Sequence, residues 1–525
     1  MPVRKLLRLF INGELNKRRP AACYSSVVAQ ELVRRRGFLS AAGAMLAGAA
    51  AGGAADRPPN FILILADNLG YGDLGCYGST RHRTPHIDRM AREGLRFTSF
   101  YAASGVCTPS RASLMTGCYP RRVGLDRTEP DGHVLRPVSP NGLHPDEVTI
   151  AEILKQRGYS TSIVGKWHLG DQLPFLPTRQ GFDDYFGIPY SEDMVGGRRL
   201  PGQQTPWPPL PLMENERVIE APADCNQLTR RYTERCVEII RRRGKPFCLY
   251  LAHARPGSTP APFAGEAFRG KSANGPYGDA VEELDGSTGE ILAALKETGQ
   301  DGDTLVVWTS DNGAVRRDPP QGSNLPLGGW GYTTAEGGQR IPCIARWPGR
   351  IPAGRSLDAI ATLMDWLPTF AGLAGARLPE DRIIDGKDIR PLLTGTSRRT
   401  PHEAFYYYYG PQLQAVRSGR WKLCLPLDRK WLNFAGRTAK AEAALYDLDT
   451  DAGETRNVAA QNPEAVRRLT ALAEKARADL GDVDRPGKGQ RPAGRFPNPV
   501  PRVRTGAGAP PAAPAAGRGF RRPVL

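Results

Sequence analysis

Cysteine pairs of the kind that hold zinc are missing from this sequence. Its nine cysteines include no Cys-x-x-Cys pair and follow no regular spacing, so neither a zinc module nor a disulfide framework is indicated. No internal repeat is present either, which argues against a solenoid. With 24% charged and 40% apolar residues, the chain has the composition of a globular protein and not of one disordered throughout.

The middle of the chain has little net positive charge. The net charge is +17, but residues 1–40 and 481–525 each carry nine Lys or Arg against two acidic residues, which leaves about +3 for the rest. Binding to nucleic acid depends on basic residues clustered on the folded body. We therefore expect no nucleic-acid partner.

Long hydrophobic runs are lacking as well. Residues 38–55 are weakly apolar, rich in Gly and Ala, and short for a membrane span, so no stable span is expected. They follow Arg34-Arg35-Arg36-Gly-Phe-Leu-Ser, and twin arginines before such a region are typical of a twin-arginine export signal. We predict that residues 1–55 are such a signal, read by the twin-arginine export machinery of a bacterium, and that the protein is periplasmic or secreted. A membrane anchor is the alternative.

Short apolar runs do alternate with helical segments over most of the chain. Strands are predicted at residues 60–66, 159–165, 246–252 and 304–309, and helices at 85–93, 148–157, 228–243 and 279–298. Continuous apolar strands that alternate with helices are typical of a parallel sheet covered on both faces. The sequence therefore predicts an α/β fold for residues 56–395, a doubly wound and mostly parallel sheet flanked by helices.

The pattern changes after about residue 395. Residues 396–480 contain short strands separated by Gly turns and end in a helix from about Pro463 to Leu480, which predicts a smaller C-terminal α+β subdomain with an antiparallel sheet. Residues 481–525 hold nine Pro and eight Gly with little to bury. We expect them to form an extended or disordered tail.

Polar side chains follow four of the predicted strands. In an open α/β sheet, ligands gather at the carboxyl ends of the strands, so these side chains are expected to share one edge. Among them, paired Asp and Asn residues offer hard oxygen donors of the kind that suit Ca²⁺ or Mg²⁺ and not zinc. The four strand ends are Asp67-Asn68, Lys166-Trp-His168, His253 and Asp311-Asn312.

The most specific motif is Cys107-Thr-Pro-Ser-Arg111, which is followed by Ala and then by Leu-x-Thr-Gly. This run resembles the signature of the sulfatases. The segments Gly165-Lys-Trp-His-Leu-Gly170, Ser310-Asp-Asn-Gly313 and Glu336-Gly-Gly338 are similar to the branch that includes arylsulfatase A and galactosamine-6-sulfatase. The likeness extends over residues 58–490 and implies the alkaline-phosphatase-like fold.

The resemblance also implies a reaction. Cys107 would be oxidised by a formylglycine-generating enzyme, and its hydrated aldehyde would attack the sulfur of a sulfate monoester to give a covalent sulfo-enzyme intermediate. Arg111 and Lys166 would neutralise developing charge, His168 would take the proton that releases sulfate, and His253 would protonate the departing alcohol. A metal, Ca²⁺ or else Mg²⁺, would be held by five residues: Asp67, Asn68, Cys107, Asp311 and Asn312.

Two positions depart from the pattern of the family. Many members have Asp where this chain has Asn68, and most place a sulfate-contacting Lys within the stretch that is here residues 328–338, which contain none. Arg316, Arg317 or Arg340 could supply the missing charge. We predict hydrolysis of sulfate monoesters of a sugar or an aryl alcohol. The alternatives are a phosphonate or phosphate monoester hydrolase of the same superfamily and a non-catalytic protein that binds sulfated glycans.

Overall fold

A computed structural model describes residues 58–128, 132–197, 206–242, 244–432 and 437–504. The predicted export signal, residues 1–55, and the end of the predicted tail, residues 505–525, lie outside the described residues. Within the described part of the chain, no helix combines the length and the apolar character that crossing a bilayer requires.

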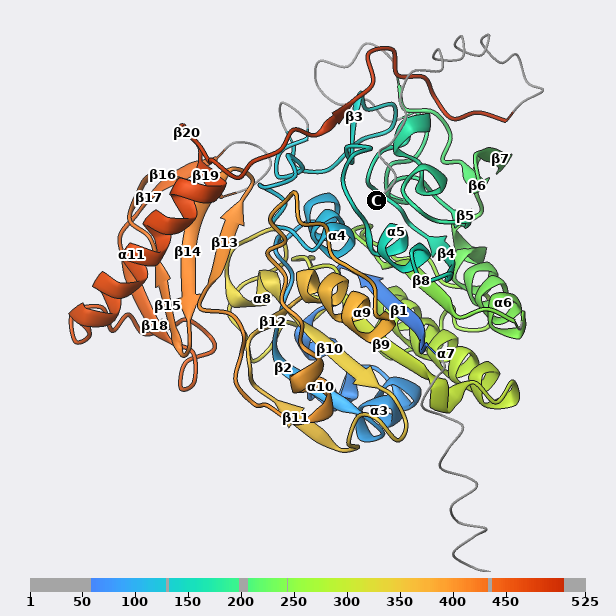
Figure 1. The fold of residues 1–525 in the computed structure, drawn as a ribbon, viewed down its shortest axis with the longest axis horizontal. Coiled ribbons are helices and arrows are strands. Elements are labelled where there is room, and N and C mark those ends of the chain that lie inside the picture. The colour runs from blue at the N-terminus through green and yellow to red at the C-terminus, as the bar shows by residue number, and fades with distance from the viewer. Residues whose placement is uncertain (1–57, 129–131, 198–205, 243, 433–436, 505–525) are drawn as a thin grey trace, which may run out of the picture. The chain divides into compact units, whose positions relative to one another are not determined.

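A large mixed sheet forms the centre of the fold (Figure 1). Its five central strands are mutually parallel, in the order β9 (Thr304–Ser310), β1 (Asn60–Asp67), β8 (Phe247–Pro256), β4 (Ser160–Gly165) and β5 (Asp184–Gly187). All residues of β1, β8 and β9 are buried, which explains their continuous apolar runs. The prediction of an α/β fold with a mostly parallel sheet is confirmed.

The two edges of this sheet include antiparallel strands. On one side, β10 (Arg340–Arg346) pairs antiparallel with both β9 and β2 (Leu95–Tyr101), and β2 pairs parallel with β11 (Arg355–Leu357) and β12 (Ala361–Thr362). On the other side, β6 (Leu212–Glu214) and β7 (Arg217–Glu220) continue antiparallel from β5.

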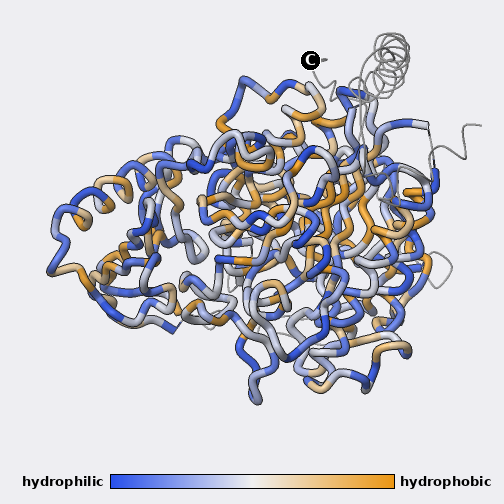
Figure 2. The backbone as a smooth tube through the Cα atoms, turned by 90° about the horizontal axis from the view of Figure 1, so that it is seen from below, coloured by the Kyte–Doolittle hydropathy of each residue, from blue (hydrophilic) through white to orange (hydrophobic). Residues whose placement is uncertain are grey.

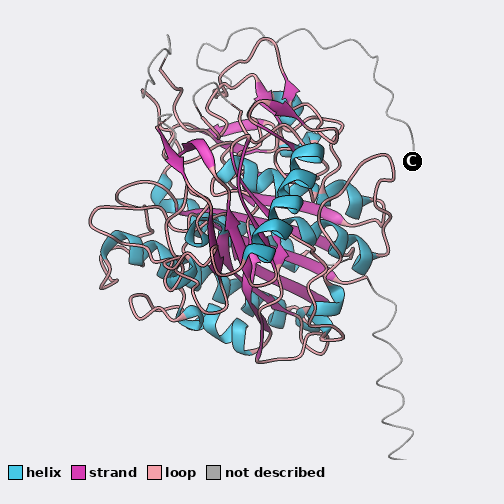
Figure 3. Cartoon of the chain, turned by 90° about the vertical axis from the view of Figure 1, so that its left-hand side faces the viewer, coloured by secondary structure: helices cyan, strands magenta, loops and turns pink. Residues whose placement is uncertain are grey.

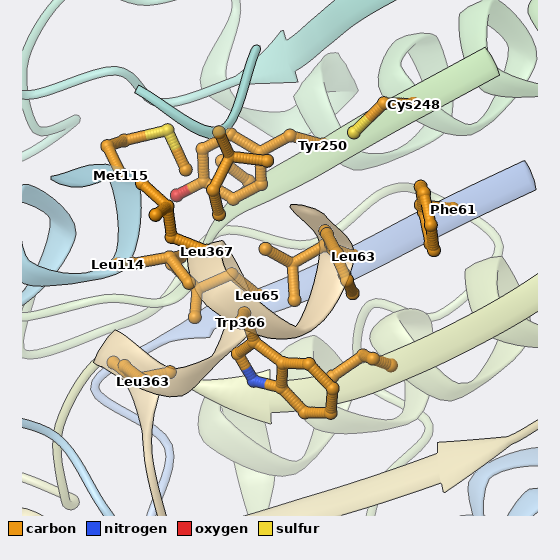
Figure 4. Packing of buried hydrophobic residues seen from close by; sticks show 14 of the residues in the cluster. Phe61, Leu63, Leu65, Leu114, Met115, Cys248, Tyr250, Leu363, Trp366 and Leu367 are labelled. Atoms are coloured by element: carbon orange, nitrogen blue, oxygen red, sulfur yellow. The ribbon is translucent and has the colours of Figure 1, made fainter. Parts of the chain in front are cut away.

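Helices cover both faces of the sheet (Figure 3). Side chains of β1 alternate between two cores, because successive residues of a strand point to opposite faces. Phe61, Leu63 and Leu65 pack with the side chains of α4 (Cys107–Thr116), α5 (Ile150–Lys155) and α9 (Trp366–Ala374), as Figure 4 shows for Leu114, Met115, Trp366 and Leu367. Ile62, Ile64 and Ala66 face α3 (Pro85–Arg92), α6 (Leu228–Arg241) and α7 (Gly275–Glu297).

Most predicted elements form close to their expected bounds. Helix α5 begins after Thr149, whose side chain accepts from the backbone N–H of Glu152 while the Glu152 side chain accepts from Thr149. Helix α7 begins before the predicted residue 279, because Pro276 fits the first turn of a helix and does not interrupt it.

A smaller C-terminal region has sheets of its own. Its antiparallel sheet runs β13 (Phe405–Tyr409), β14 (Gln412–Ser418), β15 (Trp421–Cys424) and β18 (Ala444–Asp447), and α11 (Pro463–Leu480) packs on β14 and β15 (Figure 1). A hairpin of β16 (Leu427–Trp431) and β17 (Thr438–Ala441) adjoins it, and α10 (Arg390–Thr394) precedes it. In Figure 2 the hydrophobic segments gather inside both regions and the hydrophilic ones lie mainly outside.

The first half of the predicted tail is not a detached segment. After the short pair β19 (Gly481–Asp482) and β20 (Arg485–Pro486), β21 (Gly494–Arg495) pairs with β3 (Asn141–Gly142). Arg491 donates to both carboxylate oxygens of Glu147 at 2.7 and 2.9 Å, and Val500 N–H donates to Gln172 at 2.8 Å. Residues 481–504, expected to belong to an extended or disordered tail, are held by polar contacts to distant parts of the chain.

Candidate active site

The ends of three strands bring five of the predicted residues together. Strands β9, β1, β8 and β4 are adjacent and parallel, so their carboxyl ends share one edge of the sheet. All five side chains are completely or almost completely buried there. They are Asp67 and Asn68 at the end of β1, Lys166 after β4, and Asp311 and Asn312 after β9.

Arg111 joins two of these strand ends. It lies one helical turn after Cys107 on α4, so both side chains are on the same face of the helix. Its guanidinium donates to Asp67 Oδ1 at 2.9 Å, to Asp311 Oδ2 at 2.9 and 3.1 Å, and to the backbone carbonyl of Lys166 at 2.8 Å. The position of helix α4, which begins at Cys107, is thereby tied to the two carboxylates.

Lys166 is a second buried cation of the site. Its Nζ lies 2.7 Å from Asp67 Oδ1 and donates to Ser191 Oγ at 3.1 Å. Burial disfavours the charged amine, but the neighbouring carboxylate of Asp67 outweighs this effect and raises the pKa of Lys166. Lys166 is therefore charged at neutral pH.

The oxygen donors at the edge fit a hard divalent cation. Ligand atoms of Asp67, Cys107 and Asp311 lie within 4.8 Å of one another, and Asn312 Oδ1 is buried without a hydrogen-bond partner. Burial and the charge of Asp67 raise the pKa of Asp311 to about 7, whereas Lys166 and Arg111 overcome burial and hold the pKa of Asp67 below its usual range. A divalent cation would relieve the repulsion between these two carboxylates.

Backbone strain is concentrated at this edge. Of the six non-glycine residues with positive φ among the described residues, three are here: Asn68 at 58°, His168 at 61° and Tyr332 at 66°. Such conformations cost roughly 1–3 kcal/mol each and persist where surrounding contacts fix them, typically at functional sites.

Cys107 occupies the first residue of α4 and is almost completely buried. Its Sγ lies 4.0 Å from Asn68 Oδ1. Burial and the charges of Asp67 and Asp311 raise the pKa of the thiol well above its ordinary value, so the unmodified side chain is not an activated thiolate.

His168 is held as a neutral imidazole. Its Nε2 lies 2.9 Å from the backbone carbonyl of Leu135, and because a carbonyl only accepts, Nε2 carries the proton and Nδ1 has a free lone pair. Nδ1 is buried without a hydrogen-bond partner. Burial, Lys166 and Arg111 keep the pKa of His168 well below its usual value. The imidazole is therefore neutral, with its free lone pair on Nδ1, and its lowered pKa makes it a weak base.

His253 is not brought to this cluster. It lies within β8 and has the same strand parity as Leu249 and Leu251, which face α6 and α7. Its Nε2 is 3.4 Å from Ser287 Oγ of α7, and burial with the charge of Arg255 lowers its pKa to about 3. The expected role as proton donor to the leaving alcohol has no support in this geometry.

The structure places the three arginines proposed to replace the missing lysine in different surroundings. Arg316 is exposed, Arg317 donates to the backbone carbonyls of Gly257 and Thr259, and Arg340 donates to the Thr98 carbonyl at 2.6 Å with Glu336 3.5 Å away. Arg316 is thus turned to solvent and Arg340 is engaged elsewhere, whereas Arg317 keeps one buried guanidinium nitrogen, Nη1, without a hydrogen-bond partner.

Sequence reasoning missed several residues that adjoin the site. Ser191 contacts Lys166, and Tyr332 N–H donates to the Gly105 carbonyl at 2.9 Å, two residues before Cys107. No motif marks these positions. The only available signal was that residue 332 lies in the stretch without a lysine.

A further buried ion pair lies near the cluster. Arg255 Nη1 is 3.5 Å from Glu192 Oε1, and a Cβ on Gly257 would collide with the Glu192 carboxylate, so only glycine fits there. Burial raises the pKa of Glu192 and the charge of Arg255 lowers it, and the resulting pKa is about 7. The site therefore has a neighbouring carboxyl that titrates near neutral pH.

Comparisons with known proteins agree with this geometry. The family model described as Sulfatase matches residues 59–376, and the one described as N-sulphoglucosamine sulphohydrolase, C-terminal, matches residues 333–478. The chain is 39% identical to human arylsulfatase A over 465 residues, covering 82% of this chain and 89% of that protein.

Two other relatives extend the comparison to sugar sulfates and to solved structures. N-acetylgalactosamine-6-sulfatase of the dog, Canis lupus familiaris, is 40% identical over 398 residues, covering 73% of this chain and 74% of that protein. Among solved structures, the PsFucS1 sulfatase from Pseudoalteromonas sp. superimposes with a TM-score of 0.70 at 28% identity, covering 80% of this chain and 91% of that one.

Proposed function

The chain belongs to the sulfatase family, whose members hydrolyse sulfuric esters, and we propose that it cleaves sulfate monoesters of sugars or aryl alcohols at the cluster around residue 107. The observation that carries this proposal is the joint placement of Cys107, Arg111 and Lys166 beside the two carboxylates. A cation pair close to a buried nucleophile position is what an anionic ester requires.

Residue 107 would act after oxidation to formylglycine, which when hydrated supplies a hydroxyl in place of a thiol. The raised pKa of the Cys107 thiol supports this need for modification. A formylglycine-generating enzyme is therefore a partner of the chain. We also propose that the protein is exported to the periplasm or beyond by the twin-arginine route, and the support for this is the sequence of residues 1–55.

Asp67, Asn68, Asp311, Asn312 and residue 107 would hold the metal, Ca²⁺ or else Mg²⁺, which would polarise the ester oxygens. The unpartnered Asn312 Oδ1 and the adjacent carboxylates support this assignment. The chain's own side chains would carry out the other steps. Arg111 and Lys166 would balance the charge on the sulfuryl group, and Ser191 would orient Lys166. His168 Nδ1 would accept the proton whose removal releases sulfate.

The test is to express the protein together with a formylglycine-generating enzyme and to analyse the peptide that contains residue 107 by mass spectrometry. We expect the aldehyde mass and hydrolysis of para-nitrophenyl sulfate, with both lost in Cys107→Ala. Hydrolysis by protein in which Cys107 is unconverted would contradict the mechanism. Faster turnover of the corresponding phosphate or phosphonate ester would favour the phosphoester alternative, and binding of sulfated glycan without turnover would favour the non-catalytic one.

A further inference from the structure

Leu135 links the imidazole of His168 to the first turn of α4. Its N–H donates to Thr108 Oγ1 at 3.1 Å, and its carbonyl accepts from His168 Nε2 at 2.9 Å. At the other end of the same segment, the N–H of Leu143 donates to the Leu169 carbonyl at 2.8 Å. The orientation of the imidazole therefore depends on where the segment between these two leucines lies.

The chain that follows α11 is fastened to this segment, residues 135–143. Its strand β21 pairs antiparallel with β3, and the N–H of Phe496 donates to the Pro140 carbonyl at 2.7 Å. In Figure 1 the red chain after α11 passes beside β3. We call residues 491–500 the strap.

Gln172 holds the far end of the strap with both ends of its side-chain amide. This fully buried side chain accepts from the N–H of Val500 at 2.8 Å through Oε1, and its Nε2 donates to the Val500 carbonyl at 3.1 Å. The same Nε2 donates to Asp171 Oδ1 at 2.8 Å, and Asp171 Oδ2 accepts from the N–H of Val138 at 2.6 Å. Hydrogen bonds thus run without a break from the strap to the segment that contains Leu135.

Val138 is the strained point of that segment. Its φ is 63°, which is an outlier for a β-branched residue. Such a conformation persists only where the surrounding contacts fix it, and the carboxylate of Asp171 is one of these contacts. When the strap is removed, Asp171 and Gln172 lose their support, so Val138 can relax and the carbonyl of Leu135 can move away from His168.

We propose that the strap is a positioning element of the active site. Through Gln172 and Asp171 it holds the Leu135 carbonyl against His168 and so fixes the orientation in which the imidazole takes part in the reaction. The inference rests on the proposed function. It goes beyond that function by giving a role to a segment that follows residue 478, where the match to the second family model ends.

The experiment compares two truncations of the metal-loaded, fully formylglycine-converted enzyme. Ending the chain after Pro492 removes most of the strap but keeps Arg491, which binds Glu147. We expect kcat for para-nitrophenyl sulfate to fall by about 10- to 100-fold with little change in KM, because a displaced catalytic group slows the reaction while the cations that would bind sulfate stay in place. Ending the chain after Arg504 is the matched control, which keeps the whole strap and should keep kcat.

Gln172→Met tests the same link without shortening the chain, and it also serves if the first truncation does not fold. Methionine keeps the length of the side chain and removes its hydrogen bonds, so kcat should fall as in the truncation. Gln461→Met, at an exposed position, is the control that should keep kcat. If kcat stays within about twofold of the wild type in both Gln172→Met and the chain that ends at Pro492, the inference is wrong.

A double variant separates positioning of His168 from a general loss of stability. In the His168→Ala background, removal of the strap should cause no further fall in kcat, because its effect acts through the imidazole that is already missing. A truncation that only destabilised the protein would lower kcat by the same factor in both backgrounds. Equal factors would therefore contradict the proposal.

Failure of the proposed function can be told apart from failure of this inference. If the fully converted wild type hydrolyses no sulfate ester, the proposed function is wrong, and hydrogen exchange measured by mass spectrometry then tests the strap alone. The amides of Leu135 and Val138 should exchange about tenfold or more faster in the chain that ends at Pro492 than in the one that ends at Arg504. Equal exchange in the two proteins would overturn the inference.

Discussion

Two nitrogens of Arg111 donate to a single carboxylate oxygen of Asp311, at 2.9 and 3.1 Å, and neither side chain is exposed to solvent. The same guanidinium also donates to Asp67. Helix α4 and the ends of two strands are thus joined through one planar cation, a geometry that a lysine ammonium cannot reproduce.

Replacing Arg111 should disrupt both activity and stability. Arg111→Ala leaves the Asp67 and Asp311 carboxylates short of a buried partner, and we expect a loss of roughly 3–5 kcal/mol in the free energy of unfolding. Arg111→Lys should keep part of the stability and lose most of kcat/KM, because the forked geometry is gone. Chemical denaturation and ester hydrolysis measure the two effects. Arg316→Lys, at an exposed position, is the control that should change neither.

Removal of the metal should lower both activity and thermal stability. A chelator should abolish hydrolysis, and added Ca²⁺ or Mg²⁺ should restore it and raise Tm, since a ligand at 100 times its Kd stabilises by about 2.7 kcal/mol. Asn312→Ala should weaken this metal-dependent shift, because it removes the unpartnered Oδ1. It should also lower the Tm of the metal-free protein, because Asn312 Nδ2 donates to Asn68 Oδ1 at 2.6 Å and to the Gly313 carbonyl at 2.9 Å, so the shift is measured against the metal-free variant. Asn462→Ala, in the C-terminal region, should keep the full shift. An unaltered shift in Asn312→Ala would remove this residue from the ligand set.

Substitution of the two histidines predicted from the sequence should have different effects on kcat. His168→Ala should lower kcat by about 10²- to 10⁴-fold, the usual contribution of a positioned proton acceptor. His253→Gln should leave kcat close to the wild-type value, because His253 faces Ser287 of α7 and not the cluster. A large loss of kcat in His253→Gln, with Tm unchanged, would restore the role expected from its sequence position.

Acid should weaken the contact between the catalytic and C-terminal regions through Glu336. This buried carboxylate accepts from Tyr101 and Tyr407 at 2.5 and 2.6 Å and pairs with Lys422 at 3.1 Å. Burial would raise its pKa, but Lys422 and two arginines lower it from 4.5 to about 2. The folded pKa lies below the unfolded one, so this stabilisation is present above about pH 4.5 and is lost as the pH falls toward 2.

Glu336→Gln should therefore lower the free energy of unfolding at pH 7 by roughly 3–5 kcal/mol, since it leaves buried cations without their partner. It should also flatten the decline in stability between pH 4.5 and 2. Glu442→Gln is the matched control, because Glu442 and its partner Lys440 are exposed and their ion pair contributes little. Equal pH dependence in Glu336→Gln and the wild type would contradict the assignment.

Much of the site was predictable because its signals are local. Asp67-Asn68 and Asp311-Asn312 directly follow buried strands, and the parallel order of those strands brings them together at one edge. Cys107 and Arg111 are separated by one helical turn, which places both on one face. His253 also follows an apolar run, but its strand continues to Pro256, and the alternation of that strand turns the imidazole toward α6 and α7.

By itself the sequence determined the Cys107–Arg111 motif, the two Asp-Asn pairs and the α/β alternation, since each depends on residues close together in the chain. Tertiary structure alone decided which face His253 takes, that residues 481–504 dock on distant segments, and that Tyr332 meets the backbone next to Cys107. These outcomes depend on strand parity, on polar pairing between remote segments and on the close approach that Gly105 permits. No local pattern encodes such contacts, because their energy arises only when the whole core has packed.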